Sequence, residues 1–337
     1  MAGADGRWSH AGGDGVFISL GSQVSALQHL PVLLEEVLAV LNVQDDGIYV
    51  DATYGRGGHA AAILDRLSAR GRLLAIDRDP EAVAAAQKRF GGDVRFSIMR
   101  GRFSMLKQYI AHSGWTGRVN GIVLDLGVSS PQLEDPARGF SFQRSGPLDM
   151  RMDPEVGTPA ARWINTAEEA EIASVLRTLG EERFAKRVAK MIVSQRSVQP
   201  IETTARLAEI VAAAVPTREP GKDPATRSFQ AIRMHVNQEL TELETTLPQC
   251  LDVLAPGGRL AVVSFHSLED RLVKRFMRNE AKGDPFPSDL PVLHATLAPR
   301  LRLRGKAMRA SAAEIRQNPR ARSAVLRAAE RIAPAHG

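Results

Sequence analysis

The chain has 337 residues, of which 44% are hydrophobic, so it is long enough for about two domains with sizeable cores. Its single cysteine, Cys250, excludes a disulfide framework and a cysteine zinc site. The formal net charge of +6 is concentrated between Arg300 and Arg331, where ten basic residues stand against two acidic ones, so the rest of the chain is near neutral.

The composition also bears on where the protein works. No apolar run approaches the roughly 18 residues that a membrane helix needs. Residues 1–28 contain many Gly, Ser and Ala but lack the basic segment and apolar run of a secretory signal, and we expect them to be a disordered extension. We therefore expect a cytoplasmic protein without a membrane partner.

The first predicted elements are a helix and a nucleotide-binding unit. Pro31 suits the first turn of an amphipathic helix that reaches Leu41. A buried strand at 48–50 is followed by the loop Asp51–His59, whose glycines let the backbone approach a ligand, and then by a second helix. The next strand ends at Asp77, at the distance where a βαβ nucleotide-binding unit places the acid that binds ribose hydroxyls.

Three acidic residues end predicted strands: Asp51, Asp77 and Asp125. Because the carboxyl ends of parallel strands meet at the edge of an open α/β sheet where ligands bind, we expect the three carboxylates at one rim. The glycine spacing also occurs in dinucleotide enzymes, but three carboxylates would repel a pyrophosphate. They would attract the sulfonium and ammonium groups of S-adenosylmethionine, so the electrostatics favour that cofactor.

The alternation of strands and helices up to Asp125 predicts an α/β fold with a doubly wound, Rossmann-like parallel sheet. No strand pattern is visible from 136 to 225. Amphipathic helices are expected there and just beyond, at 166–179, 181–193, 203–215 and 227–254, before a strand at 258–265.

This pattern predicts the domain organisation. We expect a sheet domain formed by 29–135 and 226–299, with an inserted all-helical domain at 136–225 that helps to shape a substrate cleft. A basic C-terminal tail is expected at 300–337. Such a tail favours a polyanionic partner, with a solubilising role as the alternative.

The chain resembles a known family in a series of motifs that run in the same order. The family is that of ribosomal RNA small subunit methyltransferase H, bacterial enzymes that methylate N4 of a cytidine in 16S ribosomal RNA with S-adenosylmethionine. The motifs are His29–Leu34, Asp51–His59, Ile76–Pro80, Asp125–Gln132, Arg138–Phe142, Gly146–Asp153, Gly180–Arg183, Pro224–Ala231, Ser264–Arg271 and Asn318–Ser323.

The resemblance covers about residues 29 to 332 and implies a class I methyltransferase fold. It implies 16S ribosomal RNA of the small subunit as partner, in the decoding region, and no metal; the oligomeric state stays open, a homodimer included. The resemblance implies cofactor contacts at Gly57, Gly58, His59, Asp77, Phe103, Asp125 and Gln132.

The residues themselves support some of these roles. Phe103 follows a strand at the sheet edge and could pack on an adenine, with core packing as the alternative. His59 opens a helix, where its free backbone N–H could meet a carboxylate. Asp77 could instead cap the next helix, and Gln132 carries little signal of its own.

Methylation of a cytosine amine sets further requirements. The lone pair of the amine is delocalised into the ring, so the enzyme mainly needs alignment and a group that accepts the amine proton. We hypothesise that Asp125, with the loop Gly127–Ser130, orients the amine; the alternative is that Asp125 serves only the cofactor.

Other residues have two alternative roles. The segment Ser264–Ser267 could line the cleft, while Ser267–Asp270 fits a capping box. Trp163 could stack on an unpaired base or anchor a core. No role is assigned to Asp149 and Arg151.

Two other functions remain as alternatives. A dinucleotide-dependent oxidoreductase would bind a nicotinamide cofactor (NAD), and the three acids argue against it. A non-catalytic RNA-binding or ribosome assembly factor with a methyltransferase fold would bind the cofactor without turnover.

Overall fold

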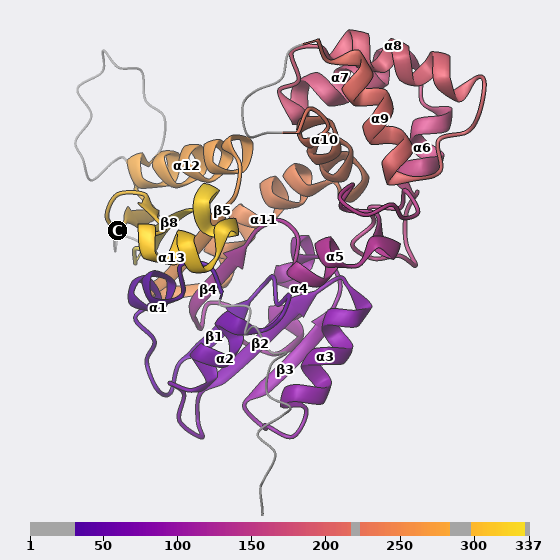
Figure 1. Cartoon of the computed structure of the whole chain (residues 1–337). Coiled ribbons are helices and arrows are strands. Elements are labelled where there is room, and N and C mark those ends of the chain that lie inside the picture. The colour runs from indigo at the N-terminus through magenta and orange to yellow at the C-terminus, as the bar shows by residue number, and fades with distance from the viewer. Residues whose placement is uncertain (1–30, 217–222, 284–297, 334–337) are drawn as a thin grey trace, which may run out of the picture.

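The computed structural model describes residues 31–216, 223–283 and 298–333 (Figure 1), so the extension expected at 1–28 lies outside the described residues. One sheet forms its centre, with the strand order β3-β2-β1-β4-β5-β8-β6 and β7 paired with β8. The strands are β1 (Ile48–Asp51), β2 (Arg72–Asp77), β3 (Phe96–Arg100), β4 (Val119–Asp125), β5 (Leu254–Ser264), β6 (Leu301–Leu303), β7 (Met308–Arg309) and β8 (Val325–Arg331).

The strands from β3 to β5 are parallel, and the order reverses between β1 and β4, which confirms the doubly wound sheet. The inner strands read as runs of Val, Ile and Leu because both faces of the sheet are covered. In the register of this sheet Asp51 pairs with Val123, and Asp125 pairs with Val263. The carboxyl ends therefore meet at one edge, beside the point where the order reverses, which is where ligands bind in such sheets.

Two layers of helices cover the sheet. On one face α1, α2 and α3 share a buried cluster with side chains such as Tyr49 and Leu73, and on the other face α4, α11 and α12 pack against Ile122 and Val262. The helices of the sheet domain are α1 (Leu34–Leu41), α2 (Gly58–Leu64), α3 (Pro80–Phe90), α4 (Leu106–His112), α5 (Ser130–Glu134), α11 (Glu239–Val253), α12 (Ser267–Lys282) and α13 (Ala312–Gln317).

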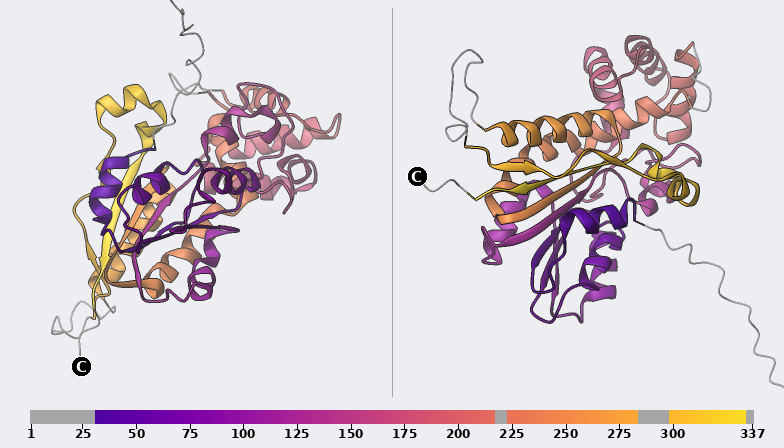
Figure 2. Two further views of the ribbon diagram at one scale, coloured as in Figure 1. Left: turned by 90° about the horizontal axis from the view of Figure 1, so that it is seen from below. Right: turned by 90° about the vertical axis from the view of Figure 1, so that its left-hand side faces the viewer.

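A separate cluster of helices, here called the helical unit, lies beside the sheet (Figures 1 and 2). It comprises α6 (Ala160–Thr166), α7 (Glu169–Gly180), α8 (Ala185–Arg196), α9 (Thr204–Ala214) and α10 (Thr226–Asn237), which share one hydrophobic core. Gly180 lets α7 approach α10 closely, because a Cβ there would lie 2.6 Å from the carbonyl oxygen of Arg227. The expected division at 225 stays a prediction, although the core of the helical unit includes α10.

The long helix expected at 227–254 is two helices. Gln238 has a left-handed backbone, with φ 55°, and it ends α10 and begins α11. A residue other than glycine in this conformation leaves no strong signal in the sequence. The break matters because it turns the chain from the helical unit back to the sheet.

The prediction of a separate basic tail is wrong for residues 301–331. Strand β8 pairs antiparallel with β5 on one side and with β6 on the other, so this segment completes the sheet. Its inward-facing side chains, among them Leu326 and Ala329, are fully buried. The strand is not evident from the charge pattern, because Arg327 and Arg331 belong to a long basic segment.

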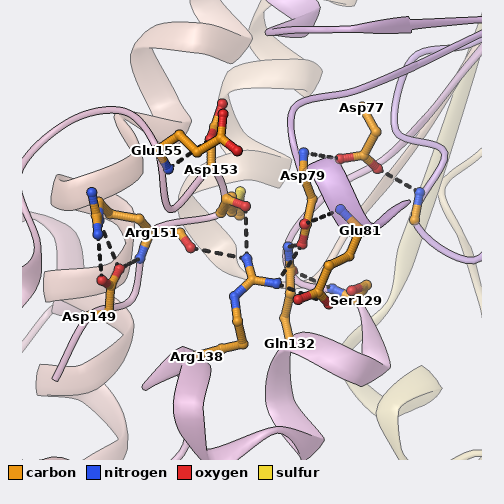
Figure 3. Close-up of polar contacts among 12 residues, drawn as sticks. Asp77, Asp79, Glu81, Ser129, Gln132, Arg138, Asp149, Arg151, Asp153 and Glu155 are labelled. Carbon is orange, nitrogen blue, oxygen red and sulfur yellow. Dashed lines mark hydrogen bonds and ion pairs between the residues drawn. The ribbon is translucent and has the colours of Figure 1, made fainter. Parts of the chain in front are cut away.

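A buried ion pair joins the sheet to the entry of the helical unit (Figure 3). Arg138 ends the short turn Pro136–Arg138 and donates from Nη1 to Oδ2 of Asp79 over 2.9 Å. Its Nη2 donates to the carbonyl oxygen of Met152 over 2.8 Å. Asp79 also caps α3, because its Oδ1 accepts from the backbone N–H of Glu81. Both charged side chains are buried, so this pair fixes the start of α3 to the segment that leads into α6.

The segment around Asp149 and Arg151, to which the sequence assigns no role, forms a braced turn. The two side chains pair over 2.7 Å (Figure 3), and Met150 between them has a left-handed backbone. Asn237 at the end of α10 donates to the carbonyl oxygen of Met150 and accepts from the N–H of Met152. The turn therefore ties the end of α10 to the residues that Arg138 contacts.

We predict that Arg138→Met destabilises the protein by about 3–5 kcal/mol, because the change leaves the carboxylate of Asp79 buried without its charged partner. Arg70→Met is the matched control, since Arg70 and its partner Asp46 are exposed and an exposed pair contributes little. Urea unfolding of both variants measures the difference. Equal losses in the two variants would contradict the structural role of the buried pair.

Candidate active site

A cavity of about 620 Å³ opens at the carboxyl edge of the sheet. Its walls come from the glycine loop after β1, from the ends of β2, β4 and β5, and from helices α10 to α12. The turn Pro319–Ser323, just before β8, adds Arg320 and Ser323. Segments far apart in the sequence thus meet around one space.

The glycine loop needs its glycines for different reasons. Gly57 has φ 68°, and a Cβ there would lie 2.4 Å from the ring of Tyr54. A Cβ on Gly58 would lie 2.8 Å from Pro31. The backbone N–H of Gly55 donates to Oδ2 of Asp77 over 2.7 Å, which fixes the loop to the end of β2. Gly58 lines the cavity, whereas Gly57 shapes the loop and is not among the lining residues.

The three acids predicted to share a rim are close together but not equivalent. Asp77 and Asp125 line the cavity, whereas Asp51 is 1% exposed and lies behind the loop, where it accepts from the N–H of Thr53. Burial raises the pKa of Asp51 to about 7, and nearby Asp77 adds to the shift. We call these three residues the carboxylate rim.

Burial also raises the pKa of the two acids of the carboxylate rim that line the cavity. The pKa of Asp77 is raised to about 6, although its carboxylate accepts hydrogen bonds from the backbone N–H groups of Asp79 and Gly55. The pKa of Asp125 is raised to about 8, because the nearby acids Asp51 and Glu269 add to the effect of burial. Ionised carboxylates are therefore unfavourable here without a counter-charge, so the cavity is suited to a cationic ligand.

His59 faces Asp125 from the start of α2. Burial lowers its pKa to about 4, so the ring is neutral at neutral pH. Its Nε2 lies 3.2 Å from the carbonyl oxygen of Val32, which can only accept, and the proton is therefore on Nε2. The bare Nδ1 lies 3.7 Å from Oδ2 of Asp125. Oδ1 of Asp125 is buried and has no hydrogen-bond partner among the described residues, so it is available to a ligand.

Three further residues that the sequence singles out differ in whether their side chains are already engaged in contacts within the protein. Phe103 lines the cavity and also packs against the core beside α4, so its two alternative roles coexist. The amide of Gln132 is engaged: Nε2 donates to Oδ2 of Asp79 over 2.7 Å, and Oε1 accepts from the N–H of Ser129 (Figure 3). Trp163 is a core anchor, since it is 9% exposed and its Nε1 donates to Glu171.

The sequence reading missed a polar wall contributed by α10, α11 and α12. Arg233 donates from Nε and Nη2 to the two carboxylate oxygens of Glu239, each over 2.8 Å. Both residues line the cavity, together with Asn237, Glu242 and Glu269. The only signal in the sequence was a charged residue, Arg233, in the middle of an amphipathic helix. That signal is weak unless the break at Gln238 is known.

The start of α12 also differs from the prediction. His266, not Ser267, caps this helix, and Glu269 completes the capping box by accepting from the backbone N–H of His266. Ligand atoms of Glu239, His266 and Glu269 lie within 4.8 Å of one another, a donor set that could bind a cation, although Arg233 already pairs with Glu239. The expectation of no metal stays a prediction.

No helix among residues 31–216, 223–283 and 298–333 has the length and apolar character needed to cross a membrane.

Comparison with known proteins identifies the family. The chain is 59% identical over 310 residues to ribosomal RNA small subunit methyltransferase H of Thioalkalivibrio sulfidiphilus (strain HL-EbGR7), which covers 90% of this chain and 98% of that protein. Among solved structures, it is similar to a putative rRNA methylase from Clostridium thermocellum, with a TM-score of 0.42, 11% identity and coverage of 90% and 97%. A putative methyltransferase from Streptococcus mutans in complex with SAH gives a TM-score of 0.40 at 11% identity, with coverage of 90% and 98%. The model of the MraW methylase family matches residues 26–332, and this chain belongs to that family.

Proposed function

We propose that the chain transfers a methyl group from S-adenosylmethionine to the N4 amine of a cytidine in 16S ribosomal RNA of the small subunit. The observation that carries this proposal is the 59% identity to a small subunit methyltransferase, which extends over 98% of that protein. The cavity at the switch point of the sheet supports the same reaction, because Asp77 and Asp125 of the carboxylate rim suit a cationic cofactor.

The residues present fit S-adenosylmethionine, which supplies an electrophilic methyl group when it is bound. Oδ1 of Asp125 is a buried acceptor without a partner among the described residues, as a site for a cation requires. Asp77 would bind ribose hydroxyls, and Gly58, His59 and Phe103 would complete the cofactor site. Gln132 would act through Asp79 and Ser129, because both ends of its amide are engaged.

The acceptor base would lie against the polar wall formed by Arg233, Asn237 and Glu239. A paired cytosine has its amine engaged, so the base must be unpaired or extruded to enter. The fixed guanidinium and carboxylate groups offer both donors and acceptors to the edge of a base. Helix α10 of the helical unit thus reaches the cavity through Arg233 and Asn237 of this wall, and also through Thr226.

Asp125 is the residue best placed to act on the amine. As a carboxylate it would accept an amine proton, which localises the nitrogen lone pair. The pKa of about 8 makes it a stronger base than an ordinary aspartate. We further propose that the protein works in the cytoplasm; a homodimer stays a prediction.

We predict that the purified protein transfers labelled methyl groups from S-adenosylmethionine to small ribosomal subunits, and that nuclease digestion places the label on N4 of a cytidine. Label on another nucleoside would contradict the proposed substrate atom. Cofactor binding without transfer would favour the non-catalytic assembly factor, and tight binding of NADH in its place would favour the oxidoreductase.

We predict that Asp125→Asn lowers the single-turnover rate of methyl transfer by about 10²–10⁴-fold, with a smaller loss of cofactor affinity. At subsaturating cofactor, the rate of the unchanged protein should rise with increasing pH as Asp125 of the free protein ionises, and the variant should lose that rise. Asp93→Asn is the control, because Asp93 lies away from the cavity and pairs with Arg95. If lost cofactor affinity accounts for the entire effect, Asp125 serves the cofactor only.

A further inference from the structure

A second, smaller concavity lies outside the cavity, between α12 and the strands β6 and β8. We call it the hollow; its volume is about 100 Å³. Three exposed cations line it from two elements: Lys274 and Arg278 of α12, and Lys306 of the turn between β6 and β7. The hollow therefore gathers positive charge from segments that are distant in the sequence.

These cations differ from their neighbours in having no acidic partner. On the same elements, Arg271 pairs with Glu181, Arg275 with Glu244, Arg300 with Glu280, Arg304 with Glu330, and Arg327 with Asp270. No ion pair joins Lys274, Arg278 or Lys306 to any acid within the described ranges. The local carboxylates are thus already engaged, and the charge over the hollow is left for an external anion.

The lining of the hollow suits one phosphodiester unit. No Asp or Glu is among its described lining residues, so an anion meets no repulsion from the walls. Met277, Ala307 and Ala328 give apolar surface, and Leu303 remains 44% exposed beside them. A phosphate could contact the cations while its sugar covers the apolar surface.

The chain connects the hollow to the cavity. Leu303 and Lys306 line the hollow, and after β7 and α13 the turn Pro319–Ser323 places Arg320 and Ser323 at the cavity. β8 then returns to the hollow through Arg327 and Ala328. A strand of nucleic acid that places one base in the cavity could therefore lay its backbone along this segment.

We propose that the hollow binds a backbone phosphate of the RNA substrate, away from the nucleotide that is methylated. The inference rests on the proposed function, because that function makes RNA the substrate. It gives a role to Lys306, one of the basic residues between 300 and 331 that the sequence predicts as part of a tail. Contacts of this kind contribute affinity and position rather than sequence specificity.

The test compares Lys274→Ser/Lys306→Ser with the control Lys88→Ser/Arg118→Ser. Both pairs remove two exposed cations, and the control residues line neither the hollow nor the cavity. Binding to small ribosomal subunits is measured across a range of salt concentrations. We expect the hollow variant to bind about tenfold more weakly and to lose about one unit of salt slope per phosphate-contacting cation, while the control changes little.

Two further arms separate the possible outcomes. Lys274→Arg/Lys306→Arg should retain the affinity, and calorimetry with S-adenosylmethionine should give equal affinity for all variants, which shows that they are folded. Equal weakening of the hollow and control variants, or no weakening of either, would overturn the proposal. If the unchanged protein binds subunits but transfers no methyl group, the proposed function fails, while the comparison of variants still decides the role of the hollow.

Discussion

The structure depends on a cluster of carboxyl groups held out of water at the ends of β1, β2 and β4. Burial disfavours their ionised forms; Asp77 further raises the pKa of Asp51, and Asp51 further raises the pKa of Asp125. Backbone donors from the glycine loop offset part of this cost at Asp77. What is missing is a positive charge, since the one basic ring nearby, His59, is neutral. A cationic methyl donor would supply it, and this requirement connects the fold to the chemistry.

The same edge of the sheet also positions the substrate side. Asp79, two residues after Asp77, holds Arg138 and Gln132, and Arg138 in turn holds the turn that Asn237 braces. A short chain of buried and partly buried hydrogen bonds therefore runs from the carboxylate rim to the end of α10. Because α10 and α11 carry the polar wall of the cavity, the rim and the wall cannot move independently without breaking a buried ion pair.

The sequence was sufficient for features that depend on local patterns. Apolar runs and glycine spacing predicted the parallel sheet, the loop and the position of Asp77, because burial on both faces and close backbone approach constrain residue types directly. It was insufficient where tertiary contacts decide. Nothing local marks Gln238 as the break between two helices, and the surrounding basic residues concealed β8. The pairing of Arg233 with Glu239 depends on that break and could not be predicted either.

The central claim is that the carboxylate rim is a seat for a cation, and proton release on cofactor binding tests it most directly. Groups with raised pKa hold protons in the free protein, and a bound cation favours their ionised forms, so binding must expel protons between about pH 6 and 8. Titration calorimetry in buffers of different ionisation enthalpy measures this release. We expect net release and rising affinity with pH for S-adenosylmethionine, and a smaller release for S-adenosylhomocysteine, which lacks the sulfonium charge. Equal release for both ligands, or none, would contradict the account.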